Sequence, residues 1–215
     1  MSRGARRSLV FLWVTLTAAG SLLAIAARGA GPLPGDLALT RWLQYSLPPD
    51  DLGGWLLTHP GRIVWFLPAA FLAVTLLRRR WLAALFMVAA GVTGLLVGDS
   101  LKLLVARARP SAELVRVYDL PKDYGFPSTT ALLSVVLLGM VCYLAGWERS
   151  WSPFVVVVLG VSLTLVLVIG ISRIYLGEHW ATDVVGGWLF GGAWLLILIA
   201  FHRWWTSGQP HPGVP

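Results

Sequence analysis

The sequence predicts an all-α membrane protein, a bundle of six transmembrane helices with an amphipathic interfacial helix between the first two spans. Of its 215 residues, 57% are hydrophobic and only 13% are charged, which is too apolar for a water-soluble domain of this length. The apolar residues also gather into runs close to the roughly 20 residues that cross a bilayer. No linker or low-complexity tract interrupts the chain, so we expect residues 1–215 to form a single domain.

Six apolar runs are candidate spans. They cover about residues 9–27, 63–77, 81–98, 128–146, 154–171 and 183–201. The second run is short and needs help from its flanks. The stretch between the first two runs contains five prolines and is too interrupted to span. Within it, residues 36–45 place leucines and Trp42 among polar residues, which predicts the short helix at the membrane interface.

The arginines between the runs predict the orientation. With six spans, the arginines of the short basic loops fall on one side of the membrane: Arg3, Arg6, Arg7, Arg78, Arg79, Arg80, Arg149 and Arg203. By the positive-inside rule this side is cytoplasmic, so we expect a multi-pass protein of the cell membrane with both termini in the cytoplasm. The net charge of +7 then reflects topology and does not indicate a nucleic-acid partner.

Polar residues at the outer ends of the last four runs are candidates for a site. Lys102 and Arg109 are seven residues apart, which places them two turns apart on one helical face, and Pro110 then ends the helix. Two like charges on one face repel each other unless an anion lies between them. Taken alone, the pair is explained equally well by snorkelling at the interface.

The segment 123–134, DYGFPSTTALLS, supplies a second element. Residues 124–125 predict a turn, and Pro127 fits the first turn of a helix. The hydroxyls of Ser128, Thr129 and Thr130 then lie at a helix N-terminus together with free backbone N–H groups. Such a terminus binds phosphate through its donors and its dipole, although hydroxyl residues there more often form a simple cap.

The segment 172–183, SRIYLGEHWATD, supplies a third element. His179 and Asp183 are four residues apart, so on a helix the carboxylate reaches the imidazole one turn away. That contact fixes the tautomer and makes the other nitrogen a better nucleophile. Arg173 offers a planar fork matched to phosphate oxygens. The combination favours a functional role over a structural one.

Together these residues resemble the signature of the type 2 phosphatidic acid phosphatase superfamily, which includes lipid phosphate phosphatases and vanadium haloperoxidases. Two parts of that signature are complete, at Lys102, Arg109 and Pro110 and at Ser172, Arg173, His179 and Asp183. The likeness covers about residues 81–195. It implies that His179 attacks phosphorus to form a phosphohistidine and that Asp183 orients it. It further implies that the phosphate is held by Lys102, Arg109, Ser128, Thr129 and Arg173, with no metal or other cofactor.

The middle part of the signature departs from the family, whose Pro-Ser-Gly-His is Pro-Ser-Thr-Thr at residues 127–130. Thr130 takes the place of the histidine that protonates the leaving oxygen, and threonine cannot do so near neutral pH. General acid catalysis contributes about 10²- to 10⁴-fold. Its loss slows the hydrolysis of lipid monophosphates most, because they expel an alkoxide that needs a proton. A diphosphate expels a phosphate whose second pKa is about 6 and needs little protonation. We therefore expect a polyprenyl diphosphate substrate, such as undecaprenyl diphosphate, at the outer face.

Several alternatives remain at this stage. His59, on the predicted outer side, and Glu178, which points away from the site if it is helical, are other candidate proton donors. The protein is either a phosphatase or a catalytically impaired member that binds lipid phosphates for recognition or regulation. The intact His179 and Asp183 favour the phosphatase. A third hypothesis, a lipid transporter or scramblase, is supported only by the six spans and the polar outer cluster. The oligomeric state is not predicted.

Overall fold

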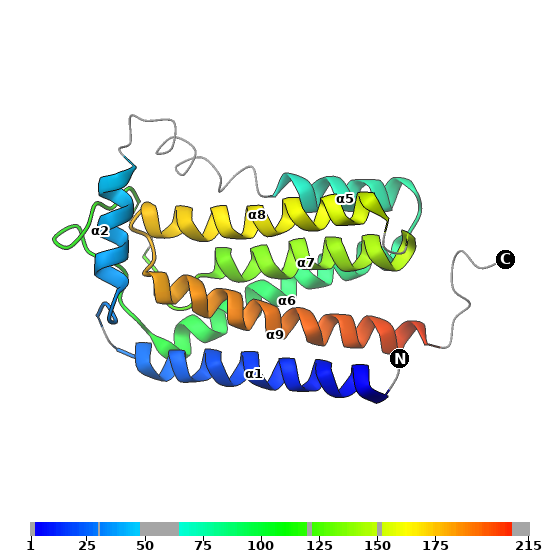
Figure 1. Ribbon diagram of the computed structural model, residues 1–215, viewed down its shortest axis with the longest axis horizontal. Helices are drawn as coiled ribbons and strands as arrows, with labels where there is room; N and C mark the ends of the chain where they lie inside the picture. The colour runs from blue at the N-terminus through cyan, green and yellow to red at the C-terminus, as the bar shows by residue number, and fades with distance from the viewer. Residues whose placement is uncertain (1–2, 30, 48–64, 120–121, 150–151, 208–215) are drawn as a thin grey trace.

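The computed structural model describes residues 3–29, 31–47, 65–119, 122–149 and 152–207 (Figure 1). Every regular element in these ranges is a helix, which confirms the all-α class. The helices are α1 (Arg3–Ala27), α2 (Asp36–Ser46), α5 (Phe66–Leu77), α6 (Trp81–Val105), α7 (Thr129–Arg149), α8 (Pro153–Tyr175) and α9 (Ala181–Thr206).

Within the described ranges, five helices are long and apolar enough to cross a membrane: α1, α6, α7, α8 and α9. They confirm five of the six predicted spans. The run predicted at 63–77 forms α5, which has 12 residues and at 1.5 Å per residue is about 18 Å long. That is shorter than the hydrocarbon core of about 30 Å. Residues 48–64, which precede it, lie outside the described part, so the count of six spans stays a prediction.

Helix α7 lies at the centre of the bundle, with α6, α8 and α9 around it and α1 on the far side of α9 (Figure 1). The close approach of α7 and α9 depends on glycines of α9. A Cβ at Gly187 would lie 2.6 Å from the Ser128 carbonyl oxygen, and one at Gly191 would lie 2.7 Å from that of Leu132. These contacts hold the start of α7 directly against α9.

The two ends of the bundle differ in chemistry. The start of α1, the α5–α6 connection and the end of α9 lie at one end (Figure 1), and they carry Arg6, Arg7, Arg78, Arg79, Arg80 and Arg203. The other end gathers the ends of α6 and α8 and the starts of α7 and α9. Every residue predicted to form the site lies on these elements or on the loops beside them.

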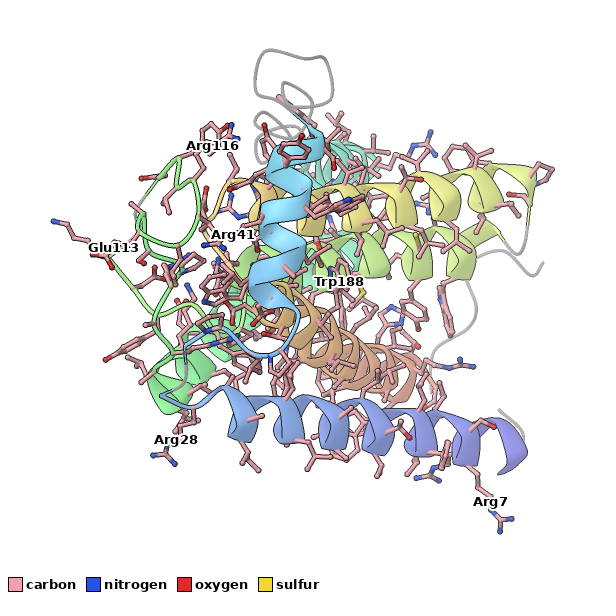
Figure 2. All side chains as sticks on the ribbon, turned by 60° about the vertical axis from the view of Figure 1, so that its left-hand side comes forward. Arg7, Arg28, Arg41, Glu113, Arg116 and Trp188 are labelled. Carbon is pink, nitrogen blue, oxygen red and sulfur yellow. The ribbon has the colours of Figure 1, made fainter. Side chains whose placement is uncertain are left out.

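Helix α2 lies across this second end, nearly perpendicular to the spans (Figures 1 and 2). The interfacial helix predicted at 36–45 therefore exists, and it is amphipathic with its polar side turned inward. Asp36, Thr40 and Gln44 are buried, whereas Trp42 and Tyr45 are exposed. Gln44 donates hydrogen bonds to the backbone carbonyls of Arg116, in the loop after α6, and of Tyr175, at the end of α8, so α2 holds the polar end of the bundle together.

Candidate active site

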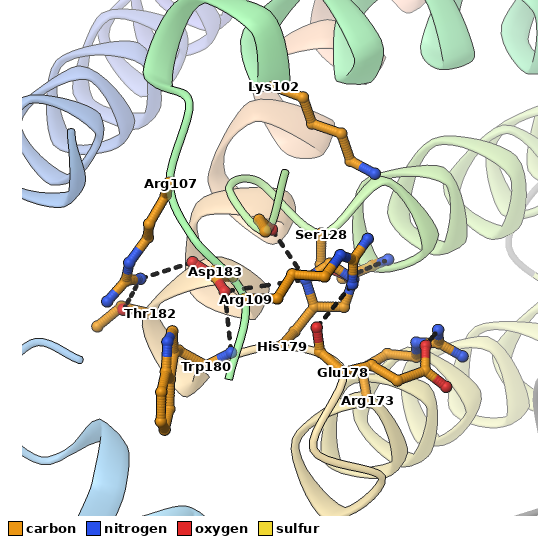
Figure 3. Close-up of polar contacts among 12 residues, drawn as sticks. Lys102, Arg107, Arg109, Ser128, Arg173, Glu178, His179, Trp180, Thr182 and Asp183 are labelled. Atoms are coloured by element: carbon orange, nitrogen blue, oxygen red, sulfur yellow. Dashed lines mark hydrogen bonds and ion pairs between the residues drawn. The ribbon is translucent and has the colours of Figure 1, made fainter. Parts of the chain in front are cut away.

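The candidate site is built from three loops at the α2 end: the one after α6, the one before α7 and the one between α8 and α9 (Figure 3). Lys102 lies in the last turn of α6, but that helix ends at Val105 and Ala106 adopts a left-handed conformation with φ 52°. Arg109 therefore lies in the loop, and the predicted shared helix face of Lys102 and Arg109 is wrong. The chain beyond Ala106 is not helical, and Arg107 and Arg109 reach different partners.

Lys102 and Arg109 nevertheless contact the same anion, as expected for two like charges that lie close together. This anion is a side chain of the protein itself, the carboxylate of Asp123. Lys102 forms an ion pair with Asp123. The Nη2 of Arg109 lies 2.7 Å from Oδ1 of Asp123, and its Nε donates to the Asp123 backbone carbonyl at 3.0 Å. Partial burial raises the pKa of Asp123, but hydrogen bonds from Lys102 and Arg109 outweigh it and lower the pKa to about 2. Asp123 is therefore ionised at neutral pH.

Arg173 is placed beside these cations by the last turn of α8, where it is largely buried and pairs with Glu178. Its Nε is buried and has no hydrogen-bond partner among the described residues. Glu178 lies in the loop after α8, and its carboxylate turns toward Arg173, which differs from the helical orientation considered above. Its backbone carbonyl accepts a hydrogen bond from Arg109 Nη1 at 2.6 Å. This loop therefore orients two of the three cations.

His179 lies in the same loop with one ring nitrogen fixed and the other facing Arg109. Its Nδ1 is 2.8 Å from the Gly125 carbonyl oxygen, which can only accept, so Nδ1 carries the proton. Its Nε2 lies 3.1 Å from Arg109 Nη1, a donor, so Nε2 presents its lone pair. Burial lowers the pKa of His179 to about 4, and the Arg109 charge opposes the raising effect of Asp183. The imidazole is therefore neutral at pH 7, with a basic nitrogen among cations.

Asp183 lies near His179, but not in the predicted way. His179 precedes α9, so the two residues do not share a helix, and Asp183 Oδ2 is 3.8 Å from His179 Nδ1. That is too long for a hydrogen bond. Oδ2 accepts the Trp180 N–H at 2.9 Å instead, which caps α9. The carbonyl of Gly125, not Asp183, sets the tautomer, and Asp183 acts on the imidazole through its charge.

The start of α7 brings Ser128, Thr129 and Thr130 to the same end of the bundle. Ser128 Oγ accepts the Ala131 N–H at 3.4 Å, and its own N–H donates to the Asp183 carbonyl. Pro127 lies outside α7, not in its first turn as predicted, because the helix begins at Thr129. Thr130 is the second residue of α7 and is half-buried.

Thr129 turns its side chain toward α6. A Cβ at Gly98 of α6 would lie 2.9 Å from Thr129 Cγ2, so the glycine leaves room for the threonine. The Thr129 hydroxyl is buried there and has no hydrogen-bond partner within the described part of the chain. The methyl of Thr129 thus fills space between α6 and α7.

A buried ion cluster beneath the site was missed from the sequence. Arg107 Nη1 lies 2.6 Å from Asp183 Oδ1 and Nη2 lies 2.8 Å from Asp36 Oδ2, with all three side chains fully buried. Thr182 Oγ1 accepts from Arg107 and donates to Asp36. Arg107 stands out in an apolar stretch two residues before Arg109. Nothing in the sequence, however, pairs it with Asp36, 71 residues away.

Comparison with known proteins identifies the family. The model of the PAP2 superfamily matches residues 79–207, which is more than half of the chain. The chain belongs to the PAP2 superfamily. This confirms the resemblance stated above, since that superfamily comprises the type 2 phosphatidic acid phosphatases. The matched range contains every residue that the sequence predicted for the site and excludes α1, α2 and α5.

Relatives of this PAP2 protein are lipid phosphatases by name. It is 33% identical over 145 residues to an undecaprenyl-diphosphatase of Sulfolobus acidocaldarius, covering 66% of this chain and 65% of that protein. It is 29% identical over 143 residues to phosphatidylglycerophosphatase B of Bacillus subtilis, covering 63% of this chain and 66% of that protein. The chain thus spans about two thirds of the length of each.

The fold has a solved counterpart. The crystal structure of a transmembrane PAP2-type phosphatidylglycerolphosphate phosphatase from Bacillus subtilis superposes with a TM-score of 0.74. The match covers 93% of this chain and 98% of the other, at 23% identity. This PAP2 protein is therefore a multi-pass membrane protein. Among its described residues, His, Cys, Asp and Glu form no group of three that could hold a metal ion.

Proposed function

We propose that this PAP2 protein is a phosphatase that releases phosphate from lipid phosphates at the outer face of the cell membrane through a phosphohistidine at His179. One observation carries the proposal. His179 Nε2 is unprotonated, because Gly125 holds the proton on Nδ1, and it lies 3.1 Å from the guanidinium of Arg109. A basic nitrogen beside a group that binds phosphate oxygens is arranged to attack the phosphorus that those oxygens surround.

The reaction follows from this geometry. Nε2 attacks phosphorus, the N–P bond forms and the bond to the leaving oxygen breaks, and Lys102, Arg109 and Arg173 stabilise the charge on the phosphoryl oxygens. The unpartnered Nε of Arg173 is a donor available for one of them. The ring becomes positively charged, and Asp183 at 3.8 Å favours that charge. Water then attacks the phosphohistidine, which releases inorganic phosphate and restores the neutral ring.

The preferred substrate is a lipid whose leaving group needs no proton, and we propose a polyprenyl diphosphate such as undecaprenyl diphosphate. Thr130, at the position of the family's proton donor, cannot protonate an alkoxide. The Glu178 carboxylate is held in an ion pair with Arg173 and is not a good substitute, and His59 lies outside the described residues. The name of the Sulfolobus relative supports a diphosphate. That of the Bacillus relative indicates a monophosphate. The rates on a diphosphate and on a monophosphate therefore have to be measured side by side.

The side of the membrane is proposed from charge. The arginines Arg6, Arg7, Arg78, Arg79, Arg80 and Arg203 lie on elements at the end of the bundle opposite His179 (Figure 1). The positive-inside rule assigns that end to the cytoplasm. The site then opens at the outer face, where a lipid diphosphate presents its head group.

A second candidate function is that of a catalytically impaired member that binds lipid phosphates. It is supported by the resemblance, which assigns Thr130 to the acid position, and by one observation: a carboxylate is paired with each of Lys102, Arg109 and Arg173. The oriented His179 argues against it, because a site that only binds phosphate has no use for a nucleophile with a fixed tautomer.

The test measures phosphate release by the purified full chain from undecaprenyl diphosphate and from undecaprenyl monophosphate. It compares the unchanged protein with His179→Ala, Thr130→His and Glu113→Gln, the last an outer-loop residue that points away from the molecule (Figure 2). We expect diphosphate turnover in the unchanged protein and in Glu113→Gln, and none in His179→Ala. Thr130→His should accelerate the monophosphate more than the diphosphate.

Two results would decide against parts of the proposal. If the unchanged protein binds the lipid but releases no phosphate, the phosphatase proposal is wrong and the second candidate function, lipid-phosphate binding, is supported. If Thr130→His changes neither rate, Thr130 does not stand at the position of the acid, and the preference for diphosphates loses its basis.

A further inference from the structure

Asp123 occupies the position between Lys102 and Arg109 where a phosphate is proposed to bind. Its side chain is 50% exposed, whereas the side chains of Lys102 and Arg109 are only 10% and 9% exposed. The two cations therefore lie at the bottom of the site and the carboxylate covers them on the solvent side. The backbone carbonyl of the same residue accepts from Arg109 Nε, so the arginine stays oriented if the carboxylate leaves.

Asp123 differs in accessibility from the other carboxylates of the site. Asp36 and Asp183 are completely buried, and Glu178 is 7% exposed. Removing any of them from its arginine would leave a buried charge without a partner, which is strongly unfavourable. Asp123, in contrast, can turn into water at little cost, because a half-exposed ion pair contributes little to stability. Among the described ion pairs of the site, it is the one that a ligand can displace.

We propose that Asp123 is a built-in competitor for the substrate phosphate and that it sets the minimum charge of the head groups that bind. The proposal rests on the proposed function, because the ligand it concerns is the phosphate of that substrate. The Asp123 carboxylate pairs with both Lys102 Nζ and Arg109 Nη2, in the position where a phosphate would have to bind to contact both. An incoming anion must therefore bind them more strongly than a carboxylate does.

The consequence concerns the membrane itself, which surrounds the site with phosphodiester lipids. A phosphodiester carries one negative charge, as does the Asp123 carboxylate, so exchange between them gains little Coulomb energy. A terminal phosphate carries close to two charges at neutral pH and gains more from the same cations. Asp123 would thus keep the site free of the abundant diesters and admit terminal phosphates.

The test uses the full chain in a neutral detergent and Asp123→Asn, which keeps the size of the side chain but removes its charge. Glu113→Gln is the matched control, because it removes one charge from the outer loops away from the cations (Figure 2). The first measurement is the binding of inorganic phosphate by calorimetry at pH 7.5. We expect the Kd to fall by roughly two- to fivefold in Asp123→Asn, in keeping with a half-exposed ion pair, and to stay constant in Glu113→Gln.

The second measurement is inhibition of turnover by phosphatidylglycerol, a phosphodiester, added to the micelles. We expect stronger inhibition of Asp123→Asn than of the unchanged protein. If the Kd for phosphate stays constant or rises in Asp123→Asn, Asp123 positions Arg109 and the proposal is wrong. If no variant releases phosphate from lipids while Asp123→Asn still tightens phosphate binding, the proposed function fails and the role of Asp123 as a competitor stands.

Discussion

Arg107 and Arg109 are two residues apart and have opposite surroundings. Arg107 is completely buried between two buried carboxylates, and it also donates to Thr182 and to the Gly31 carbonyl. Arg109 lies at the floor of the site, where it contacts His179 and a carboxylate that is half in solvent. The same residue type thus appears once inside the protein and once in a position that a ligand can reach.

The difference shows how an arginine's partners decide what it can do. Two buried carboxylates more than neutralise Arg107 and leave no charge for a phosphate, so its role is to join α2 and α9 to the loop after α6. Arg109 has a single carboxylate partner, which can be exchanged. We infer that stability depends chiefly on the Arg107 side and phosphate chemistry on the Arg109 side. The following changes break or sharpen that division, in order of decreasing effect.

The largest expected effect is a loss of stability in Arg107→Met. It leaves Asp36 and Asp183 buried without a cation, and breaking such a pair costs about 3–5 kcal/mol. Thermal unfolding in detergent checks the prediction, with Arg28→Met as the control because Arg28 is exposed (Figure 2). An unfolding temperature equal to that of the control would show that the buried cluster does not hold the bundle together.

The next effect is on activity, in Arg109→Met. Removing one group that stabilises transition-state charge costs about 10²- to 10³-fold in kcat, or about 2.7–4 kcal/mol. We expect a loss of this size in phosphate release, with a much smaller change in thermal unfolding than in Arg107→Met. Measured side by side, the two variants should separate activity from stability. Equal losses of stability would contradict the division.

A third effect depends on pH. Burial lowers the pKa of His179 from 6.5 to about 4, so between these values the unfolded chain binds a proton that the folded protein refuses. Stability should therefore fall as the pH falls from 7, by about 2 kcal/mol at pH 5 from this residue. Unfolding of the unchanged protein and of His179→Gln at pH 7 and pH 5 measures it. A variant that loses as much stability as the unchanged protein would show that His179 is not the cause.

The smallest expected effect comes from Thr182→Val. Its hydroxyl accepts from Arg107 at 2.7 Å and donates to Asp36 at 2.8 Å, and losing these bonds costs about 1–2 kcal/mol. Because the change lies on the Arg107 side, the KM for the lipid should stay constant. A raised KM at unchanged stability would show that the buried cluster acts directly on the substrate.

The sequence predicted most of the fold, because long apolar runs allow few structures in a membrane. Five spans and the interfacial helix formed where expected, since run length and amphipathic pattern are local properties. The orientation of α2 about its own axis was not predictable. Its inward polar face depends on partners such as Arg107 and the carbonyls of distant loops.

The clustering of the candidate residues could be predicted from the sequence, but their local geometry could not. Lys102, Arg109, Arg173 and His179 come together as the resemblance implied. The helical spacings did not hold: α6 ends before Arg109, and a left-handed Gly177, with φ 66°, precedes His179 in a loop. Spacing of four or seven residues predicts contact only where the helix continues. The hydrogen bond that fixes the tautomer of His179 is accepted by the backbone carbonyl of Gly125. A backbone group cannot be predicted from the pattern of side chains.

The most direct test of the account is to trap the covalent intermediate on His179. The protein is mixed with a polyprenyl diphosphate radiolabelled in its terminal phosphate, quenched in base, in which phosphohistidine is stable, and digested. We predict label on the peptide that contains His179, formed as fast as the first turnover and absent in His179→Ala. Release of labelled phosphate with no label on the protein, or with label on another residue, would contradict the account.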